Sequence, residues 1–269
     1  MIAGVLLAAA VAALAARPVE KNEKKSLPFE PGETLTYDVN WSIFHAGQIK
    51  ATLEKQTHGS DDTLVVKTSA RSQGFVSLLY KVEDDFKSVL NPDTLCSVQI
   101  SKQINEGRRH RKTNIIFDHV RKLAILEEQN LNSPHEPPKH TENEIPGCVE
   151  DIISAFYYVR SQPLNVGQKI DLAVNDGSKT RRVVVTVLGR EKIQTPLGTQ
   201  QALKAEPDVF ESLYAKKRGR MLIWFSDDDN HYPLRVRAML RQGTITGTLT
   251  SVSSSSPLST SATSDGEKH

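Results

Sequence analysis

The sequence predicts a mainly β protein: an antiparallel meander that forms a barrel or a curved sandwich, with one amphipathic helix packed on it. Apolar and polar residues alternate over about a dozen short segments, which is the period of half-buried strands. Turn-forming residues separate these segments. A single segment has clear helical periodicity, and one helix covering a curved sheet is the simplest architecture that buries both apolar faces.

The first strands are predicted between residues 35 and 127. Alternation is clearest over 35–41. The apolar run 75–80 does not alternate and predicts one helical turn, and Asn91-Pro92-Asp93 predicts a turn. Further strands in this half are predicted over 49–53, 64–70, 82–90, 96–104, 108–117 and 120–127.

The only helix longer than one turn is predicted over 149–161. The segment before it, 129–147, holds four prolines and predicts a surface loop. Two acidic residues in the first helical turn, Glu150 and Asp151, and Arg160 in the last turn suit the helix dipole. The apolar stripe of this helix is Ile152, Ile153, Phe156 and Val159, and Pro163 ends the helix.

Strands return after the helix. The Asp-Gly step at Asp176-Gly177 predicts a hairpin between residues 169–174 and 180–188. The acidic run 227–230 is predicted as a turn rather than a calcium loop, because Asp and Asn favour turns. The last strands are predicted over 200–205, 220–225, 234–240 and 244–252.

The domain organisation follows from the two ends of the sequence. Residues 1–16 are predicted as a signal peptide, because a short Ala-rich apolar run precedes the charged residues of a linker at 17–28. A buried N-terminal helix is the alternative. Residues 29–250 are predicted as a single β-rich domain and 251–269 as a disordered Ser/Thr-rich tail. No cysteine for a lipid anchor stands near the cleavage point, so a periplasmic or secreted product without a transmembrane span is expected.

Several segments make this chain resemble a known family of exported bacterial proteins. They are PFEPGETLTYDVNW with the following Ala46-Gly47, YKVEDDF, EGRRHRKTNIIFD, DIISAFYYVR with PLNVGQ, TPLGT, and GRMLIWFSDDDNHYPLRV. In this order they span roughly 28–250 and resemble the family catalogued as domain of unknown function 3108. The resemblance implies an exported, mainly β domain, similar in fold to envelope proteins implicated in exopolysaccharide or capsule export. It assigns no catalytic residue, because none is established for that family.

Composition and motifs exclude several function classes. A net charge of +2 gives no concentrated basic face, so nucleic acid is not expected as a partner. No nucleophile elbow, phosphate loop or dinucleotide fingerprint occurs, so neither enzymatic activity nor a cofactor is predicted. The run HEPPKH (135–140) cannot place two histidines one helical turn apart, because Pro137 and Pro138 forbid the helix, and no metal site is predicted.

Two groups of residues are candidates for binding. The basic patch Arg108, His110 and Lys112 would share one strand face and could meet an acidic glycan or a lipid phosphate, although a charged strand edge is the simpler interpretation. The second group is aromatic and could line an apolar cavity or a sugar-stacking cleft. It comprises Trp41, Tyr80, Phe156, Tyr157 and Trp224, with Tyr37, Phe44 and Phe225 as further candidates.

The two cysteines leave two possibilities open. A disulfide between Cys96 and Cys148 would be stable in an oxidising compartment. Alternatively, both are buried free thiols, since Cys96 is in phase with the apolar residues Val98 and Ile100. Spacing in the sequence does not decide between them.

These features predict a non-enzymatic exported cell-envelope protein. It would bind a lipid or polysaccharide ligand, or an envelope export or assembly partner. One alternative is a scaffold protein that pairs its sheet edges with a partner. Another is a hydrolase with a dispersed site, in which His45 or His110 would lie beside Asp84. An inward-pointing Asp84 would need a partner, for which Arg71 or Arg160 is expected.

Overall fold

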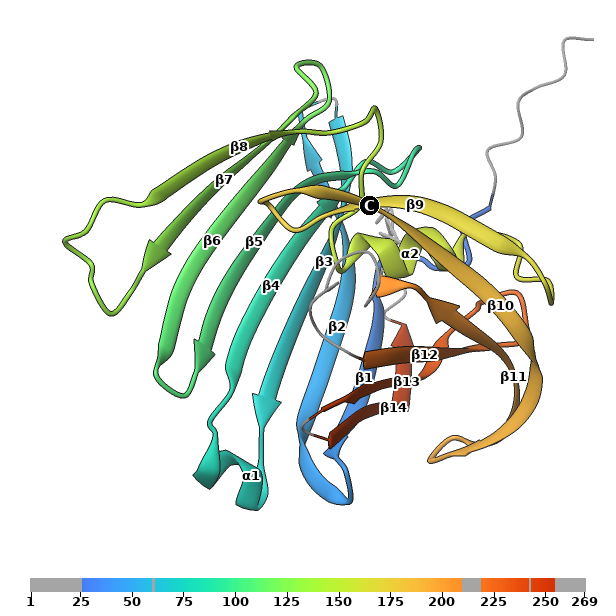
Figure 1. Ribbon diagram of the computed structural model, residues 1–269. Helices are drawn as coiled ribbons and strands as arrows, with labels where there is room; N and C mark the ends of the chain where they lie inside the picture. Colours follow the sequence, from blue (N-terminus) through green and yellow to red (C-terminus); the bar gives the residue numbers. More distant parts are fainter. Residues whose placement is uncertain (1–25, 60, 210–218, 242, 255–269) are drawn as a thin grey trace, which may run out of the picture.

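A computed structural model describes residues 26–59, 61–209, 219–241 and 243–254. Over these residues, fourteen strands form one antiparallel sheet in the order β8-β7-β6-β5-β4-β3-β2-β1-β14-β13-β12-β11-β10-β9. The sheet curves around the helix α2 (Ser154–Arg160), as Figure 1 shows. The predicted antiparallel meander with one amphipathic helix packed on it is therefore confirmed, and the sheet is open rather than a closed barrel.

The N-terminal arm of the sheet contains eight strands that pair in sequence order. A short helix, α1 (Gly74–Leu79), connects β3 to β4 and confirms the helical turn predicted at 75–80. The strands are β1 (Glu33–Trp41), β2 (Phe44–His58), β3 (Asp61–Ser72), β4 (Glu83–Leu90), β5 (Ser97–Glu106), β6 (Arg109–Asp118), β7 (Leu123–Asn130) and β8 (Lys139–Glu144).

The C-terminal arm contains six strands and joins the first arm where β14 pairs with β1. In this seam Leu35 lies opposite Val252, and Val39 lies opposite Gly247. The strands are β9 (Lys169–Asn175), β10 (Thr180–Thr195), β11 (Gly198–Pro207), β12 (Gly219–Ser226), β13 (Pro233–Leu240) and β14 (Gly243–Ser254).

The last strand extends the domain beyond its predicted end. Residues 251–254, predicted as the start of a disordered tail, belong to β14, where Ser254 pairs with Glu33. A Ser/Thr-rich sequence can form a strand here because the ladder depends on main-chain groups. The predicted signal peptide and the rest of the predicted tail lie outside the described residues.

The two edge strands, β8 and β9, meet through side chains rather than through a backbone ladder. The Nδ2 of Asn175 donates to Oδ1 of Asn143 at 2.7 Å, and Nδ2 of Asn143 donates to the carbonyl oxygen of Gly177 at 2.9 Å. The hydroxyl of Thr180 donates to the carbonyl oxygen of Glu144 at 3.1 Å. These bonds occupy edge groups that would otherwise be open to another strand.

The strand β8 was missed by the sequence prediction, which placed a surface loop over 129–147. Its sequence, KHTENE, is polar at every position and both of its faces are largely exposed. Alternation signals one buried face, and β8 has none. Only pairing with β7, where His140 lies opposite Glu127, makes this segment a strand.

The helix α2 is shorter than predicted and starts at Ser154 instead of Val149. The backbone of Val149 accepts the N–H of Ser97, and Glu150 forms a parallel bridge with Val174. These residues therefore extend the sheet instead of forming a helical turn. The carboxylate of Asp151 accepts the N–H groups of residues 153 and 154, so it caps the helix from outside.

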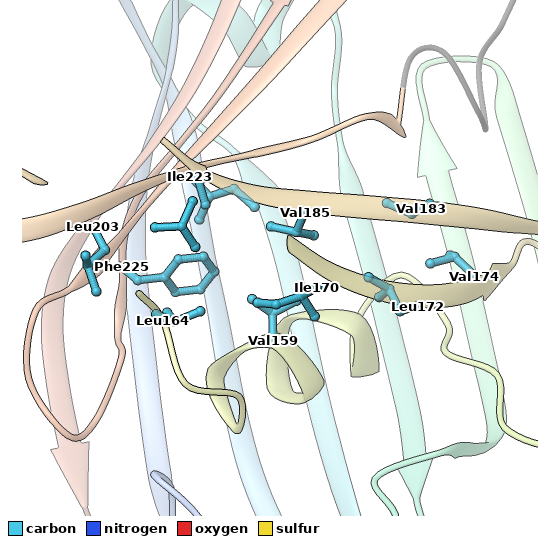
Figure 2. Packing of buried hydrophobic residues seen from close by; sticks show 12 residues of the cluster. Val159, Leu164, Ile170, Leu172, Val174, Val183, Val185, Leu203, Ile223 and Phe225 are labelled. Carbon is cyan, nitrogen blue, oxygen red and sulfur yellow. The ribbon is translucent and has the colours of Figure 1, made fainter. Parts of the chain in front are cut away.

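The helix α2 packs against both arms of the sheet. Val159 on one face contacts the largest apolar cluster, formed mainly by β9–β12 (Figure 2). Tyr157 on another face packs with Phe29, Leu53 and Leu90 of the N-terminal arm. Because a curved open sheet cannot bury its concave face against itself, this short helix serves as its internal core.

Candidate functional site

An apolar cavity of about 310 Å³ lies between α2 and the concave face of the sheet. The helix segment contributes Ile152, Ile153 and Phe156 to one wall. Strands β1–β4, β13 and β14 provide the other walls. Their lining residues are almost all apolar: Leu35, Tyr37, Val39, Ile49, Ala51, Val66, Thr68, Ala70, Phe86, Pro233, Val236, Ala238, Ile245 and Gly247.

Three hydroxyl groups, besides the guanidinium of Arg160, are the polar exceptions in this apolar lining. Burial raises the pKa of the hydroxyls of Tyr37 and Tyr157, so both stay neutral phenols that are able to donate a hydrogen bond. The hydroxyls of Tyr157 and Thr68 are buried and have no hydrogen-bond partner among the described residues. A buried polar group without a partner costs about 1–3 kcal/mol, so a bound group that could accept a bond here would be stabilised.

Arg160 forms the boundary of the cavity on the side of β1. Its guanidinium is 1 % exposed and makes two hydrogen bonds to the carboxylate of Glu33, at 2.7 and 2.8 Å. It also donates to the carbonyl oxygens of Pro28 and Asn230. The charge is thus paired with Glu33 and is not offered to a ligand. Three rings surround the guanidinium, those of Phe29, Tyr157 and Tyr232, with centroids at 5.1, 5.3 and 5.3 Å.

A second, more polar cleft of about 640 Å³ lies on the opposite side of Arg160. The acidic turn predicted at 227–230 forms part of its wall. One carboxylate oxygen of Asp228 accepts the N–H groups of Asn230 and His231 and the hydroxyl of Ser226. This geometry is that of a turn cap and agrees with the predicted turn.

The structure brings only part of the predicted aromatic group to the cavity. Phe156 and Tyr157 line it. Trp41 and Tyr80 are about half-exposed at one end of the sheet. Trp224 is buried on the other face of β12, where its indole N–H donates to Glu191. The residue type alone does not tell which aromatic side chains line the cavity. Their location depends on which face of a strand they occupy and on whether they lie at the end of a strand.

The structure places two of the three residues of the predicted basic patch on one strand face. His110 and Lys112 lie two residues apart on β6, whereas Arg108 lies in the turn before this strand. Nδ1 of His110 is 3.1 Å from Oδ1 of Asn105. Lys112 lies on the outer face of the sheet, in a shallow groove with Lys50 and other lysines. No ligand or partner tests this patch, so its binding role stays a prediction.

The two cysteines form a disulfide, with Cα atoms 5.4 Å apart across 52 residues of sequence. This selects one of the two possibilities that the sequence left open. The bond ties the segment before α2 to the start of β5. Beside it, the buried carboxylate of Asp151 accepts the hydroxyls of Ser88 and Ser97, each at 2.6 Å. The helix is therefore anchored to the sheet by covalent and polar contacts.

Asp84 is buried, as the strand phase predicted, but neither predicted partner is correct. Arg71 donates to the backbone carbonyl oxygen of Asp84, and Arg160 belongs to the buried ion pair. The carboxylate of Asp84 accepts the N–H of Asn105 at 2.8 Å. Burial, with a smaller contribution from Glu106, raises its pKa to about 6.

The histidines of the hydrolase alternative lie beside amide side chains. Nε2 of His45 is 3.3 Å from Oε1 of Gln73, and His110 is paired with Asn105. Within the part of the chain that the structure describes, neither ring is hydrogen-bonded to Asp84. The geometry therefore gives no support to this pair as a catalytic acid and base.

The fold and the cavity define an open, barrel-like β-protein with an internal helix and an apolar interior. The chain belongs to the DUF3108 family of proteins of unknown function, whose model matches residues 36–250. No curated protein matches the sequence. In the described residues, no helix is long and apolar enough to span a membrane.

Three solved structures are similar to this chain. A beta-barrel-like protein of the domain of unknown function DUF1849 from Brucella abortus has a TM-score of 0.53 and 6% identity, with 83% of this chain and 98% of that chain covered. This likeness shows a shared fold. A protein described as exported, with a YmcC-like fold, from Bacteroides fragilis has a TM-score of 0.37 and 9% identity, with 84% of this chain and 98% of that chain covered. A protein described as a lipoprotein from Parabacteroides distasonis has a TM-score of 0.36 and 10% identity, with 84% of this chain and 97% of that chain covered.

Proposed function

We propose that this protein is a non-enzymatic, exported cell-envelope protein that binds one apolar chain, such as a fatty acyl chain, in the cavity beneath α2. The nearly continuous apolar lining of this cavity is the observation that carries the proposal. Its volume of about 310 Å³ is at the lower end of the range of small-molecule sites, which favours one slender ligand.

The polar groups of the cavity favour an acyl ligand over a saccharide. A sugar carries many hydroxyl groups, each of which needs a partner once buried. The unpartnered donors beside the cavity are the hydroxyls of Tyr157 and Thr68, which suit a ligand with one carbonyl or carboxyl group. Arg160 is engaged by Glu33, so the cavity offers no free charge for acid–base chemistry.

Pairing of sheet edges with a partner has less support than ligand binding. The edge strands β8 and β9 are held to each other through Asn143 and Asn175. A partner strand would have to displace these bonds.

The cavity can be filled selectively at Gly247. This residue lies opposite Val39 and Val236, which both face the cavity, and a Cβ added to it would meet no atom within 4 Å. The variant Gly247→Leu therefore places a side chain in the ligand volume. Gly189 on β10 has the same open space and does not line the cavity, so Gly189→Leu is the matched control.

Titration with cis-parinaric acid, followed by its fluorescence, tests the proposal. We expect saturable binding to the unmodified protein and to Gly189→Leu, and a loss of affinity of about tenfold or more for Gly247→Leu. Tyr157→Phe should weaken binding by a smaller factor, because it removes one donor. Absence of saturable binding, or equal affinity of the two leucine variants, would contradict the proposal.

A further inference from the structure

One end of the sheet carries a group of exposed apolar side chains that we call the apolar rim. They lie on the β1–β2 turn, on α1 and its flanking residue, and at the start of β14. Figure 1 shows α1 and the β1–β2 turn at the same end of the curved sheet. The rim comprises Trp41, Ile43, Phe44, Phe75, Leu78, Leu79, Tyr80 and Ile245.

Backbone contacts show that these segments are neighbours. Trp41 lies opposite Ile245 across β1 and β14, and opposite Phe44 across β1 and β2. The N–H of Gln73, just before α1, donates to the carbonyl oxygen of Ala46 at 2.8 Å. At the far end of α1, the N–H of Gly107 in the β5–β6 turn donates to the carbonyl oxygen of Lys81. The apolar rim is therefore one continuous strip.

The exposure of the rim is high for side chains of this type. Ile43 is 87% exposed and Leu78 is 83% exposed, and α1 buries none of its six residues. A helix normally forms because one face packs on a core. Since α1 has no buried face, its apolar side chains are left available for an external surface, and grouped exposed apolar residues mark such contacts.

The charges around the rim fit an anionic surface. The segments 41–45, 73–81, 107–109 and 240–245 contain Lys81, Arg108, Arg109 and Arg241 and no acidic residue. Lys81 pairs with Glu83, and Arg109 pairs with Glu106. Within the described ranges, Arg108 and Arg241 form no ion pair. Apolar and aromatic side chains flanked by unpaired arginines are typical of proteins that insert into the interface of an anionic bilayer.

The rim also borders the cavity. Ile245 belongs to the rim and lines the cavity, and its register partner Ala238 lines the cavity as well. The apolar interior therefore reaches the end of the sheet that carries the exposed side chains.

We propose that the apolar rim docks the protein onto a lipid bilayer that contains anionic headgroups, with Leu78, Leu79 and Ile43 entering the interface. This docking surface goes beyond ligand binding in the cavity. The two can be tested separately, because Leu78, Leu79 and Ile43 do not line the cavity, whereas Gly247 does.

Flotation of the purified full chain with vesicles tests the docking surface. The vesicles are phosphatidylcholine alone, and equal parts of phosphatidylcholine and phosphatidylglycerol. We expect the protein to float with the mixed vesicles, more weakly with phosphatidylcholine, and less at high salt. The double variant Leu78→Gln/Leu79→Gln should lower binding about tenfold or more, since two exposed apolar side chains no longer enter the lipid. Arg108→Gln should lower binding to the mixed vesicles by about fivefold.

Two variants control this experiment. Val120 is 94% exposed on the β6–β7 turn, at the other end of the sheet, so Val120→Gln should float like the unmodified protein. Gly247→Leu should also float normally even if it no longer binds cis-parinaric acid, which separates failure of docking from failure of the proposed function.

Three results would overturn the docking proposal. The first is absence of flotation with both vesicle types. The second is flotation of Leu78→Gln/Leu79→Gln at the level of the unmodified protein. The third is a concentration-dependent dimer in sedimentation velocity that this double variant abolishes while vesicles are not bound, because the rim would then face a second copy of the chain.

Discussion

The two ends of the curved sheet differ in whether their side chains are buried and bonded to one another or exposed. At the end near α2, a disulfide joins Cys96 to Cys148, and a buried ion pair joins Arg160 to Glu33. At the other end, the helix α1 buries no residue and the rim exposes large apolar side chains.

This difference separates residues that maintain the fold from residues that are free to contact something else. A buried charge or an internal cross-link changes the free energy of unfolding when it is removed. An exposed apolar side chain contributes little to that free energy. Stability measurements should therefore respond to changes at the α2 end and not to changes at the rim, and four experiments can break or sharpen this contrast.

The largest loss of stability is expected from Arg160→Met. It leaves the buried carboxylate of Glu33 without its partner, which typically costs about 3–5 kcal/mol. Urea unfolding followed by circular dichroism gives the free energy of unfolding. The double variant Glu33→Gln/Arg160→Met removes both charges and should recover a large part of the loss. If Arg160→Met lowers the free energy of unfolding by less than about 1 kcal/mol, the ion pair between Arg160 and Glu33 does not stabilise the α2 end of the sheet.

Reduction of the disulfide should have the next largest effect. The bond closes a loop of 52 residues, which in the loop-entropy model stabilises the fold by about 4 kcal/mol. Unfolding curves with and without a reducing agent, compared with those of Cys96→Ala/Cys148→Ala, measure this contribution. Equal stability of the oxidised and reduced forms would mean that buried contacts alone anchor the segment before α2.

A dependence of stability on pH should come from Glu150. Burial raises its pKa from 4.5 to about 8, so between these pH values the folded chain holds a proton that the unfolded chain has released. Stability from this group is fully present below pH 4.5 and decreases as pH rises toward 8, by at most about 1.4 kcal/mol per pH unit.

Thermal unfolding across this pH range compares Glu150→Gln with Glu136→Gln, whose side chain is exposed. Glu150→Gln should flatten the decrease of stability with rising pH, and Glu136→Gln should leave this decrease unchanged. The same slope in both variants would assign the pH dependence to other groups.

The smallest effect is expected at the rim. Leu78→Gln/Leu79→Gln changes two exposed side chains of α1, so the free energy of unfolding should change by less than about 0.5 kcal/mol per substitution. Thermal and urea unfolding of the same preparations used for flotation provide the measurement. A loss of several kcal/mol would show that α1 is part of the packed fold and would remove the contrast between the two ends.

The strands with one buried face could be predicted from the sequence, because burial leaves a two-residue period. Residues 35–41 and 64–70 are examples, and both lie in strands of the structure. The strand β8 could not be predicted in this way, since its two faces are both solvated. The start of α2 was also misplaced, because the backbone at Glu150 pairs with β9, which is distant in sequence.

The candidate site could be predicted only in part. The apolar stripe of the helix segment correctly indicated Phe156, which lines the cavity beside Tyr157. The sequence pattern did not place Trp224 on the opposite face of β12, nor did it pair Arg160 with Glu33 across 127 residues. No local pattern encodes a contact between residues so far apart along the chain.

The sequence by itself determined that the protein is built from strands with alternating apolar and polar residues and one amphipathic helix packed on them, since the period of side-chain direction is a local property of the backbone. Only the tertiary structure decided which strands meet at the seam between β1 and β14, and which apolar residues face the cavity and which the outer surface. The physical reason is that burial and charge pairing depend on neighbours in space. Those neighbours come from both ends of the chain in this fold.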